Sequence, residues 1–164
     1  MKNQILSISL LIFILAGCAV DSNENPYKGI VFGDLKELPD FQNYKFTGGT
    51  VADGDYTFSS YIDTLTSRRL VVHSRSIEID GGKQMEYELL DLLYLDPLPE
   101  NQYISHGSCE LNEEWNKLIV VVYEFELTEY YTNIIKAWKI DESTRKFVEF
   151  PIEGIRCYND GYGT

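Results

Sequence analysis

The feature that most limits the fold of this chain is a series of short, strand-like segments separated by turn signals. Within these segments apolar or aromatic residues alternate with polar ones at the period-two spacing of β-strands. The candidate strands cover residues 27–32, 56–65, 69–79, 83–95, 117–125, 132–140, 146–152 and 155–158. About eight short strands predict a mainly β chain, folded as a single antiparallel β-barrel or β-sandwich domain.

Two turn signals predict hairpins between these segments. Asp80-Gly81-Gly82 separates the segments 69–79 and 83–95. Asp141-Glu142-Ser143-Thr144 separates the last long pair of segments and predicts a C-terminal hairpin. The leucines of segment 83–95 would also suit a helix, but two prolines that follow it and the neighbouring hairpins favour a strand.

The most apolar segment predicts where the sheet is buried. Leu118–Tyr123 has apolar residues at successive positions, which indicates a central strand covered on both faces. In the next segment, period-two spacing places Ile134, Trp138 and Ile140 on one face. By contrast, residues 33–57 are rich in glycine and aspartate and are expected to form turns.

The beginning of the chain has the composition of an export signal. Met1-Lys2-Asn3 carries one positive charge, and an apolar run from Ile5 to Leu15 and then small residues follow it. The run has about 11 residues, well short of the roughly 20 that span a bilayer. A buried core helix is the alternative, but the N-terminal position, the basic flank and the polar residues at 21–25 favour a signal.

The end of the apolar run, Leu15-Ala16-Gly17-Cys18, resembles the lipobox of bacterial lipoproteins. The resemblance covers residues 1–20 and carries no information on the function of the remaining chain. It implies that Cys18 receives a diacylglyceryl thioether and that the signal is cleaved immediately before this residue. Two or three acyl chains on Cys18 would give stable membrane anchoring.

The lipobox resemblance divides the chain into a signal peptide at 1–17, a lipidated tether at 18–26 and a β-rich domain at 27–164. Ala19 follows Cys18, where an aspartate would alter sorting in enterobacteria-like hosts. This pattern implies a lipid anchor in the outer membrane, with the domain facing the periplasm. In a Gram-positive host the same lipobox implies the outer leaflet of the plasma membrane.

Cys109 and Cys157 are the cysteines that remain after Cys18 is assigned to the lipid. An exported chain reaches an oxidising compartment, so this pair is predicted to form a disulfide. Closing a loop of roughly 50 residues stabilises a fold by about 4 kcal/mol in the chain-entropy model. A redox or metal-binding pair is the alternative, but the chain contains no CxxC motif.

The charge of the chain limits its partners. The formal net charge is −12, and removal of the signal, which carries Lys2 and no acidic residue, makes it more negative. Repulsion by phosphates disfavours nucleic acid and anionic membrane surfaces, so the lipid is left to provide the membrane contact. The acidity either keeps an exported domain soluble or attracts a cationic partner such as a basic enzyme, toxin or peptide.

No motif in the sequence identifies a catalytic or metal site. The candidate groups are His73, His106, Ser105, Ser108, the pair in Asp53-Gly54-Asp55 and the acidic cluster of Glu110, Glu113 and Glu114. The histidines lack the spacing of a metal site, and the serines lack a GxSxG setting. The acidic residues fit turns and surface clusters better than a calcium loop or a glycosidase pair. We therefore predict no enzyme activity, no metal and no cofactor.

The last informative feature of the sequence is its high content of tyrosine. The chain contains 12 tyrosines, which suit both half-buried sheet surfaces and protein-binding patches. The tail 158–164 is rich in tyrosine and glycine, and it is expected to lie near the domain because Cys157 precedes it. The leading hypothesis is a protein-binding lipoprotein, such as an inhibitor or immunity-type protein for a cationic enzyme or toxin. The alternatives are a structural or assembly lipoprotein of the outer membrane and an enzyme with an unrecognised site.

Overall fold

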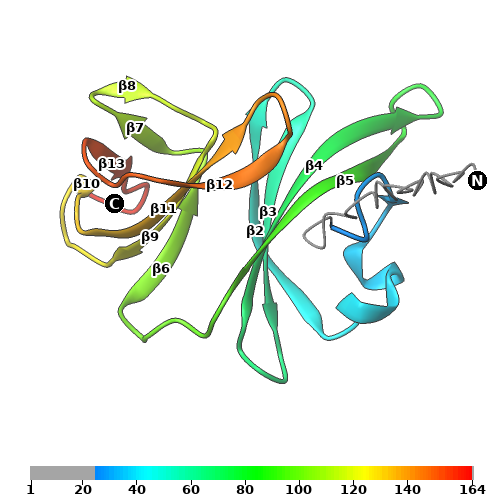
Figure 1. Cartoon of the computed structure of the whole chain (residues 1–164), viewed down its shortest axis with the longest axis horizontal. Helices are drawn as coiled ribbons and strands as arrows, with labels where there is room; N and C mark the ends of the chain where they lie inside the picture. The colour runs from blue at the N-terminus through cyan, green and yellow to red at the C-terminus, as the bar shows by residue number, and fades with distance from the viewer. Residues whose placement is uncertain (1–24, 164) are drawn as a thin grey trace, which may run out of the picture.

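The computed structural model describes residues 25–163, which form three antiparallel β-sheets (Figure 1). None of the sheets closes into a barrel within these residues, and their stacking is sandwich-like. Of the two predicted architectures, the sandwich is therefore the one adopted. The signal peptide, Cys18 and most of the tether lie outside the described residues. Between residues 25 and 163, no helix is long and apolar enough to cross a bilayer.

The N-terminal half of the molecule is a five-stranded sheet with the strand order β1-β5-β4-β3-β2. Its strands are β1 (Val31–Phe32), β2 (Tyr44–Asp53), β3 (Tyr56–Asp63), β4 (Arg69–Ile79) and β5 (Gln84–Leu95). Alternation along β4 sends Leu70 and Val72 into one core cluster and Val71 into another, on the opposite face. The ambiguous segment 83–95 is thus a strand, and the predicted turn at 80–82 connects it to β4.

One face of the five-stranded sheet is covered by the segment that precedes β2. Two 3-10 helices, η1 (Leu35–Glu37) and η2 (Pro39–Phe41), bury Leu35 and Phe41 against this face. The Asp34 side chain caps η1 by accepting a hydrogen bond from a backbone amide of its first turn, and the Glu37 side chain completes a capping box. The sheet is therefore shielded without a second sheet on this side.

The expectation that residues 33–57 form turns is wrong for residues 44–53, which form the ten-residue strand β2. Its pairing with β3 shifts register between Phe46 and Gly48, and a strand tolerates glycine at such irregularities. Gly49 is also required by a close approach, since a Cβ there would lie 3.0 Å from the carbonyl oxygen of Phe58. The first candidate strand, 27–32, is reduced to the two residues of β1.

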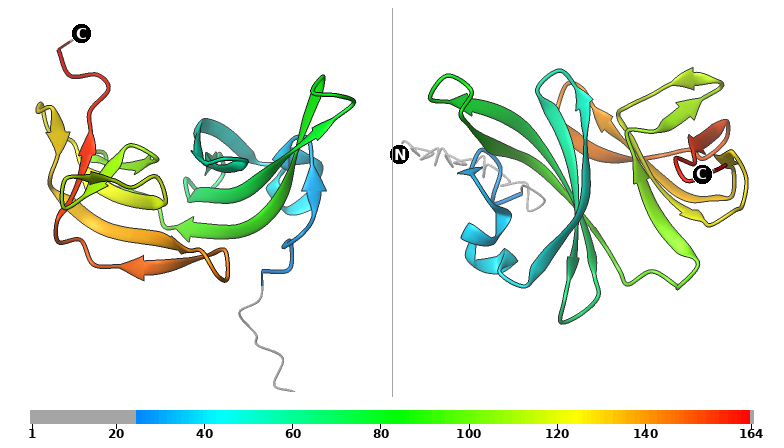
Figure 2. Two further views of the ribbon diagram at one scale, coloured as in Figure 1. Left: turned by 90° about the horizontal axis from the view of Figure 1, so that it is seen from above. Right: turned by 180° about the vertical axis from the view of Figure 1, so that it is seen from behind.

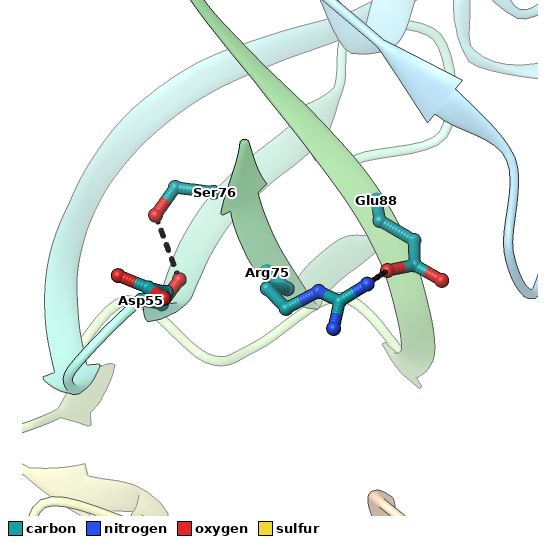
Figure 3. Close-up of polar contacts among 4 residues, drawn as sticks. All are labelled: Asp55, Arg75, Ser76 and Glu88. Carbon is teal, nitrogen blue, oxygen red and sulfur yellow. Dashed lines mark hydrogen bonds and ion pairs between the residues drawn. The ribbon is translucent and has the colours of Figure 1, made fainter. Parts of the chain in front are cut away.

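The turn between β2 and β3 contains the Asp53-Gly54-Asp55 stretch, and hydrogen bonds fix it to β4. The amide and the hydroxyl of Ser76 both donate to the Asp55 carbonyl oxygen, at 2.7 and 2.8 Å. Figure 3 shows the hydroxyl contact and, beside it, the ion pair of Arg75 with Glu88 on the neighbouring strand. The aspartates therefore belong to a structural turn, as expected.

A four-stranded sheet with the order β12-β11-β9-β6 forms the next layer. Its strands are β6 (Gln102–His106), β9 (Ile119–Glu124), β11 (Ile134–Asp141) and β12 (Lys146–Phe150). Val120 packs in a cluster with residues of the five-stranded sheet, whereas Val121 packs on the opposite side. Both the central position of β9 and the C-terminal hairpin β11–β12 are therefore confirmed.

The expected face of Ile134 is wrong. Trp138 and Ile140 pack on the side of the five-stranded sheet, but Ile134 packs on the opposite side, with Ala137. The pairing of β11 with β9 shifts register between Ile134 and Lys136, and such an irregularity reverses the face of every residue before it.

The third sheet is small and carries the disulfide. Its order is β10-β13-β7-β8, with β7 (Cys109–Leu111), β8 (Glu114–Trp115), β10 (Tyr130–Tyr131) and β13 (Ile155–Tyr158). Cys109 and Cys157 are paired neighbours on β7 and β13, and their sulfurs are bonded at 2.08 Å. The predicted disulfide is thus confirmed, and it lies within a fully buried cluster.

The two halves of the molecule meet through β12 and a shared core. Figures 1 and 2 show the five-stranded sheet on one side and the other two sheets on the opposite side. Phe58, Val120 and Ile140 belong to one buried cluster that joins the halves. The Phe147 amide also donates a hydrogen bond to Asp91 Oδ2 at 2.8 Å. The halves therefore share a core and do not form separate units.

Candidate functional site

A groove of about 930 Å³ lies where β2 meets the C-terminal half of the molecule. Its walls come from β2, from the β6–β7 turn, from the loop after β9 and from the residues after β13. We call it the aromatic groove, and its principal lining residues are Thr50, Gly107, Phe125, Leu127, Tyr158 and Tyr162. Residues more than 100 positions apart in sequence therefore form one surface.

The floor of the aromatic groove depends on the glycine in the β6–β7 turn. Gly107 has a φ of +77°, a conformation that L side chains rarely adopt. A Cβ at this position would lie 2.4 Å from Thr50 Cγ2 of β2. A side chain at residue 107 would therefore clash with Thr50, so the β6–β7 turn packs closely against β2 at this point.

One wall of the groove is a stack of aromatic rings. Tyr123 and Tyr131 are buried and stack at 4.1 Å between ring centroids, and Phe125 contacts Tyr131 at 6.1 Å. Burial, followed by the neighbouring tyrosines, raises the pKa of the Tyr123 hydroxyl, so this side chain stays uncharged. The buried pair gives the exposed residues beside it a rigid base.

The exposed apolar surface of the groove comes from Phe125, Leu127, Tyr158 and Tyr162. Leu127 is 83% exposed and Phe125 is 50% exposed. An exposed, contiguous group of large apolar side chains is typical of a binding surface, whereas isolated exposed ones need no explanation. The groove thus offers an uncovered aromatic face.

The loop that presents Phe125 and Leu127 is held in place by Glu126. The Glu126 carboxylate accepts hydrogen bonds from the amides of Thr132, at 2.6 Å, and Asn133, at 3.0 Å. These bonds lower the pKa of Glu126, so the carboxylate stays ionised at neutral pH. Alternation along the loop sends the acidic side chain inward to the backbone and leaves its two apolar neighbours exposed.

The C-terminal tail also lines the groove and is held beside the loop after β9 by a buried asparagine, Asn159. Its amide and side-chain Nδ2 donate to the carbonyl oxygens of Glu129 and Thr128, both at 2.9 Å. The Asn159 carbonyl oxygen accepts a bond from the Tyr162 amide at 3.0 Å. The tail is therefore close to the domain, as expected, and it presents Tyr158 and Tyr162 at the groove.

His106 lies at the base of the groove but lacks the partners of a catalytic histidine. Its Nε2 is 2.8 Å from the Ser60 hydroxyl, and its Nδ1 is buried with no hydrogen-bond partner among the described residues. Burial lowers the pKa of His106 and favours the neutral ring. A nucleophile–base pair usually has a third group that orients the base, and no such group meets Nδ1 here.

The serines beside His106 bond to each other. The Ser105 and Ser108 hydroxyls are 2.8 Å apart, and this contact closes the β6–β7 turn. Within residues 25–163, His106 and its neighbouring serines therefore form no arrangement of serine, histidine and acid. That the chain has no enzyme activity stays a prediction.

The other candidates from the sequence lie elsewhere. His73 is fully buried in contact with Phe58 and Phe147, whose rings also stack on each other, and burial lowers its pKa to about 4. Glu110 and Glu113 form ion pairs with Arg156 outside the groove. Across residues 25–163, no group of three or more histidine, cysteine, aspartate or glutamate side chains could hold a metal ion.

Several groove residues carry no signal that sequence patterns could have singled out. Thr50 and Gly107 contribute through contacts between distant segments, and Tyr131 contributes through stacking. Local signals exist for the tyrosines of the tail 158–164, and for Phe125 and Leu127, which alternate with glutamates at the end of the candidate strand 117–125. No protein-family model, curated protein or solved structure matches this chain.

Proposed function

We propose that this chain is a membrane-anchored envelope lipoprotein whose β domain binds a cationic protein in the aromatic groove, as an inhibitor or immunity-type protein would. The observation that carries the proposal is the composition of the groove. Its lining combines exposed tyrosine, phenylalanine and leucine with one carboxylate, Asp160, and it contains no lysine or arginine. Such a surface suits an apolar side chain on a positively charged partner.

Aromatic side chains support a protein ligand for a physical reason. Tyrosine and phenylalanine bury a large area at low conformational cost, and they are enriched in the energetic centres of protein interfaces. The wall is held by the stacking of Tyr123 on Tyr131, and the tail is held by the hydrogen bonds of Asn159. Binding would therefore cost little conformational entropy, because these segments are already ordered. A rigid groove is therefore suited to a rigid partner segment.

The charge of the chain supports a cationic partner. The net charge of −12 creates a negative potential around the whole domain, which speeds the encounter with a basic protein at low ionic strength. The same potential repels nucleic acid. The aromatic groove would then supply the short-range contacts, and the charge would supply the steering.

The lipobox supports the membrane anchor. Cys18, with Ala19 after it, is expected to fix the domain at the periplasmic face of the outer membrane, or at the outer leaflet of the plasma membrane in a Gram-positive host. Mass spectrometry of the native protein tests this point. An N-terminal, acylated Cys18 is expected, and an intact Met1 on a soluble cytoplasmic protein would contradict it.

The binding proposal is tested by crosslinking and affinity capture of the lipidated protein in its native host. The captured protein should be basic, and its recovery should fall as salt is raised. The test variant is Phe125→Ala with Leu127→Ala, and the matched control is Ile135→Ala with Ile152→Ala, an exposed apolar pair outside the groove. We expect the groove variant to lose affinity by about tenfold or more and the control to keep it.

The contradicting results are equally specific. Equal capture by the groove variant and the control would exclude the aromatic groove as the binding surface. An acidic or neutral partner, or capture that does not depend on salt, would exclude the electrostatic part of the proposal.

A further inference from the structure

A second, smaller cavity lies beside the aromatic groove, on the other side of His106. Its volume is about 220 Å³, and it opens between the start of β4 and the β5–β6 connection. The residues that matter here are Ser60, Arg69, Leu98, Gln102, Tyr103 and His106, and we call it the Arg69 cavity. Sites for drug-sized molecules measure about 300–1,000 Å³, so this cavity suits a smaller ligand.

Arg69 occupies an unusual place for a cation. It is the first residue of β4, paired with Ile62 on β3 and Leu95 on β5, on the strand face that Val71 uses to contact the C-terminal half. The side chain is half-buried, and its Nε is fully buried with no hydrogen-bond partner among the described residues. A buried, unpaired donor is costly and calls for a partner.

No carboxylate of residues 25–163 forms an ion pair with Arg69. The contrast with Arg75 and Arg156 is informative, because each of them meets a glutamate on a neighbouring strand (Figure 3 shows Arg75). The chain has 26 acidic residues against 14 basic ones, so acidic side chains are abundant. An arginine left unpaired in such a chain is available to an anion from outside.

The other groups of the cavity are uncharged and favour one class of anion. Ser60 and Gln102 offer neutral hydrogen-bonding groups, while Leu98 and Tyr103 offer an apolar wall and an aromatic wall. A single guanidinium matches a single negative charge and can bind a carboxylate through two parallel hydrogen bonds. We propose that the Arg69 cavity binds a carboxylate attached to a small apolar or aromatic group. This proposal does not depend on the function of the aromatic groove.

The test measures the affinity of the purified full-length protein for benzoate by isothermal titration calorimetry. Benzamide, which has the same ring and no charge, is the matched ligand control, and inorganic phosphate tests for a general anion site. Arg69→Gln removes the charge, and Arg68→Gln is the matched variant, because Arg68 is exposed and does not line the cavity. We expect benzoate to bind about tenfold more tightly than benzamide, and Arg69→Gln to abolish this preference while Arg68→Gln retains it.

Three results would overturn the proposal: no measurable benzoate binding, equal binding of benzoate and benzamide, or equal affinity in Arg69→Gln. Phosphate binding as tight as benzoate binding would overturn the carboxylate assignment. A thermal unfolding curve of Arg69→Gln without ligand confirms that the variant is folded. A short peptide ending in phenylalanine, with its C-terminus free or amidated, separates the two sources of a carboxylate. Preference for the free peptide over benzoate assigns a polypeptide C-terminus, and the reverse assigns a small free acid.

Discussion

The five-stranded sheet and the small disulfide-linked sheet reach stability by different means. The central strands of the first, β4 and β5, are 11 and 12 residues long and pair along most of their length. The strands of the second have two to four residues. Short strands supply few ladder hydrogen bonds and little burial. Long strands therefore hold the first sheet, whereas a covalent bond and packed tyrosines hold the second.

The largest change in stability is expected when the disulfide is removed by Cys109→Ala with Cys157→Ala. We expect the free energy of unfolding to fall by about 4 kcal/mol, because the loop that the bond closes gains entropy in the unfolded chain. Chemical denaturation measures the loss. Hydrogen exchange should show that β7 and β13 lose protection before β4 and β5 do. Uniform loss of protection across all strands would contradict the proposed difference between the sheets.

The second test concerns His73, at the junction of the two halves. Its pKa is about 4 in the folded protein and 6.5 in the unfolded chain. The unfolded state therefore binds a proton between these values while the folded state does not, and stability falls as the pH falls from about 6.5 to about 4. The loss from this group is about 3 kcal/mol.

Replacement of His73 by phenylalanine should flatten this dependence, because it removes the titrating group and keeps an aromatic ring in contact with Phe58 and Phe147. The lowered pKa of His106 leaves a smaller slope of the same sign. Denaturation at pH 7 and at pH 4.5 measures the effect. An unchanged difference between the two pH values would show that His73 is not its source.

The smallest expected effect concerns Gly107, which sets the distance between β2 and the β6–β7 turn. Gly107→Ala should lower the free energy of unfolding by about 2 kcal/mol, since it adds both backbone strain and a clash with Thr50. Gly54→Ala is the control, because residue 54 also has a positive φ but faces open space. Thermal denaturation compares the two variants. Equal losses would mean that strain alone acts and that the contact with β2 is not tight.

The sequence predicted those features that depend on local signals. Segment Leu118–Tyr123, the two hairpin turns and the pairing of Cys109 with Cys157 were all correct, since each depends on neighbouring residues or on simple counting. Gly48 and Gly49 suggested a turn, because glycine lowers strand propensity and the contact that requires Gly49 is made with a different strand.

The candidate sites were harder to predict because they depend on contacts between distant segments. Ile134 changed face at a register shift that no local pattern announces. The aromatic groove combines Gly107 with Thr50 from a distant strand, and the Arg69 cavity combines the start of β4 with residues of β6. The sequence indicated an acidic, tyrosine-rich chain but did not indicate where its tyrosines gather.

If the chain is anchored through Cys18, as proposed above, the two-residue strand β1 has a mechanical consequence. A pull on the tether would reach the domain through residues 25–32, which join β5 through the two pairs of β1 and through backbone hydrogen bonds of Gly29 and Ile30 with Leu89. Because β1 is at the edge of the sheet, such a load would break its hydrogen bonds with β5 one after another, before it separates the longer strands. Under such a load the N-terminal segment would separate from β5 before the longer strands part, and the proposed binding surfaces would stay intact.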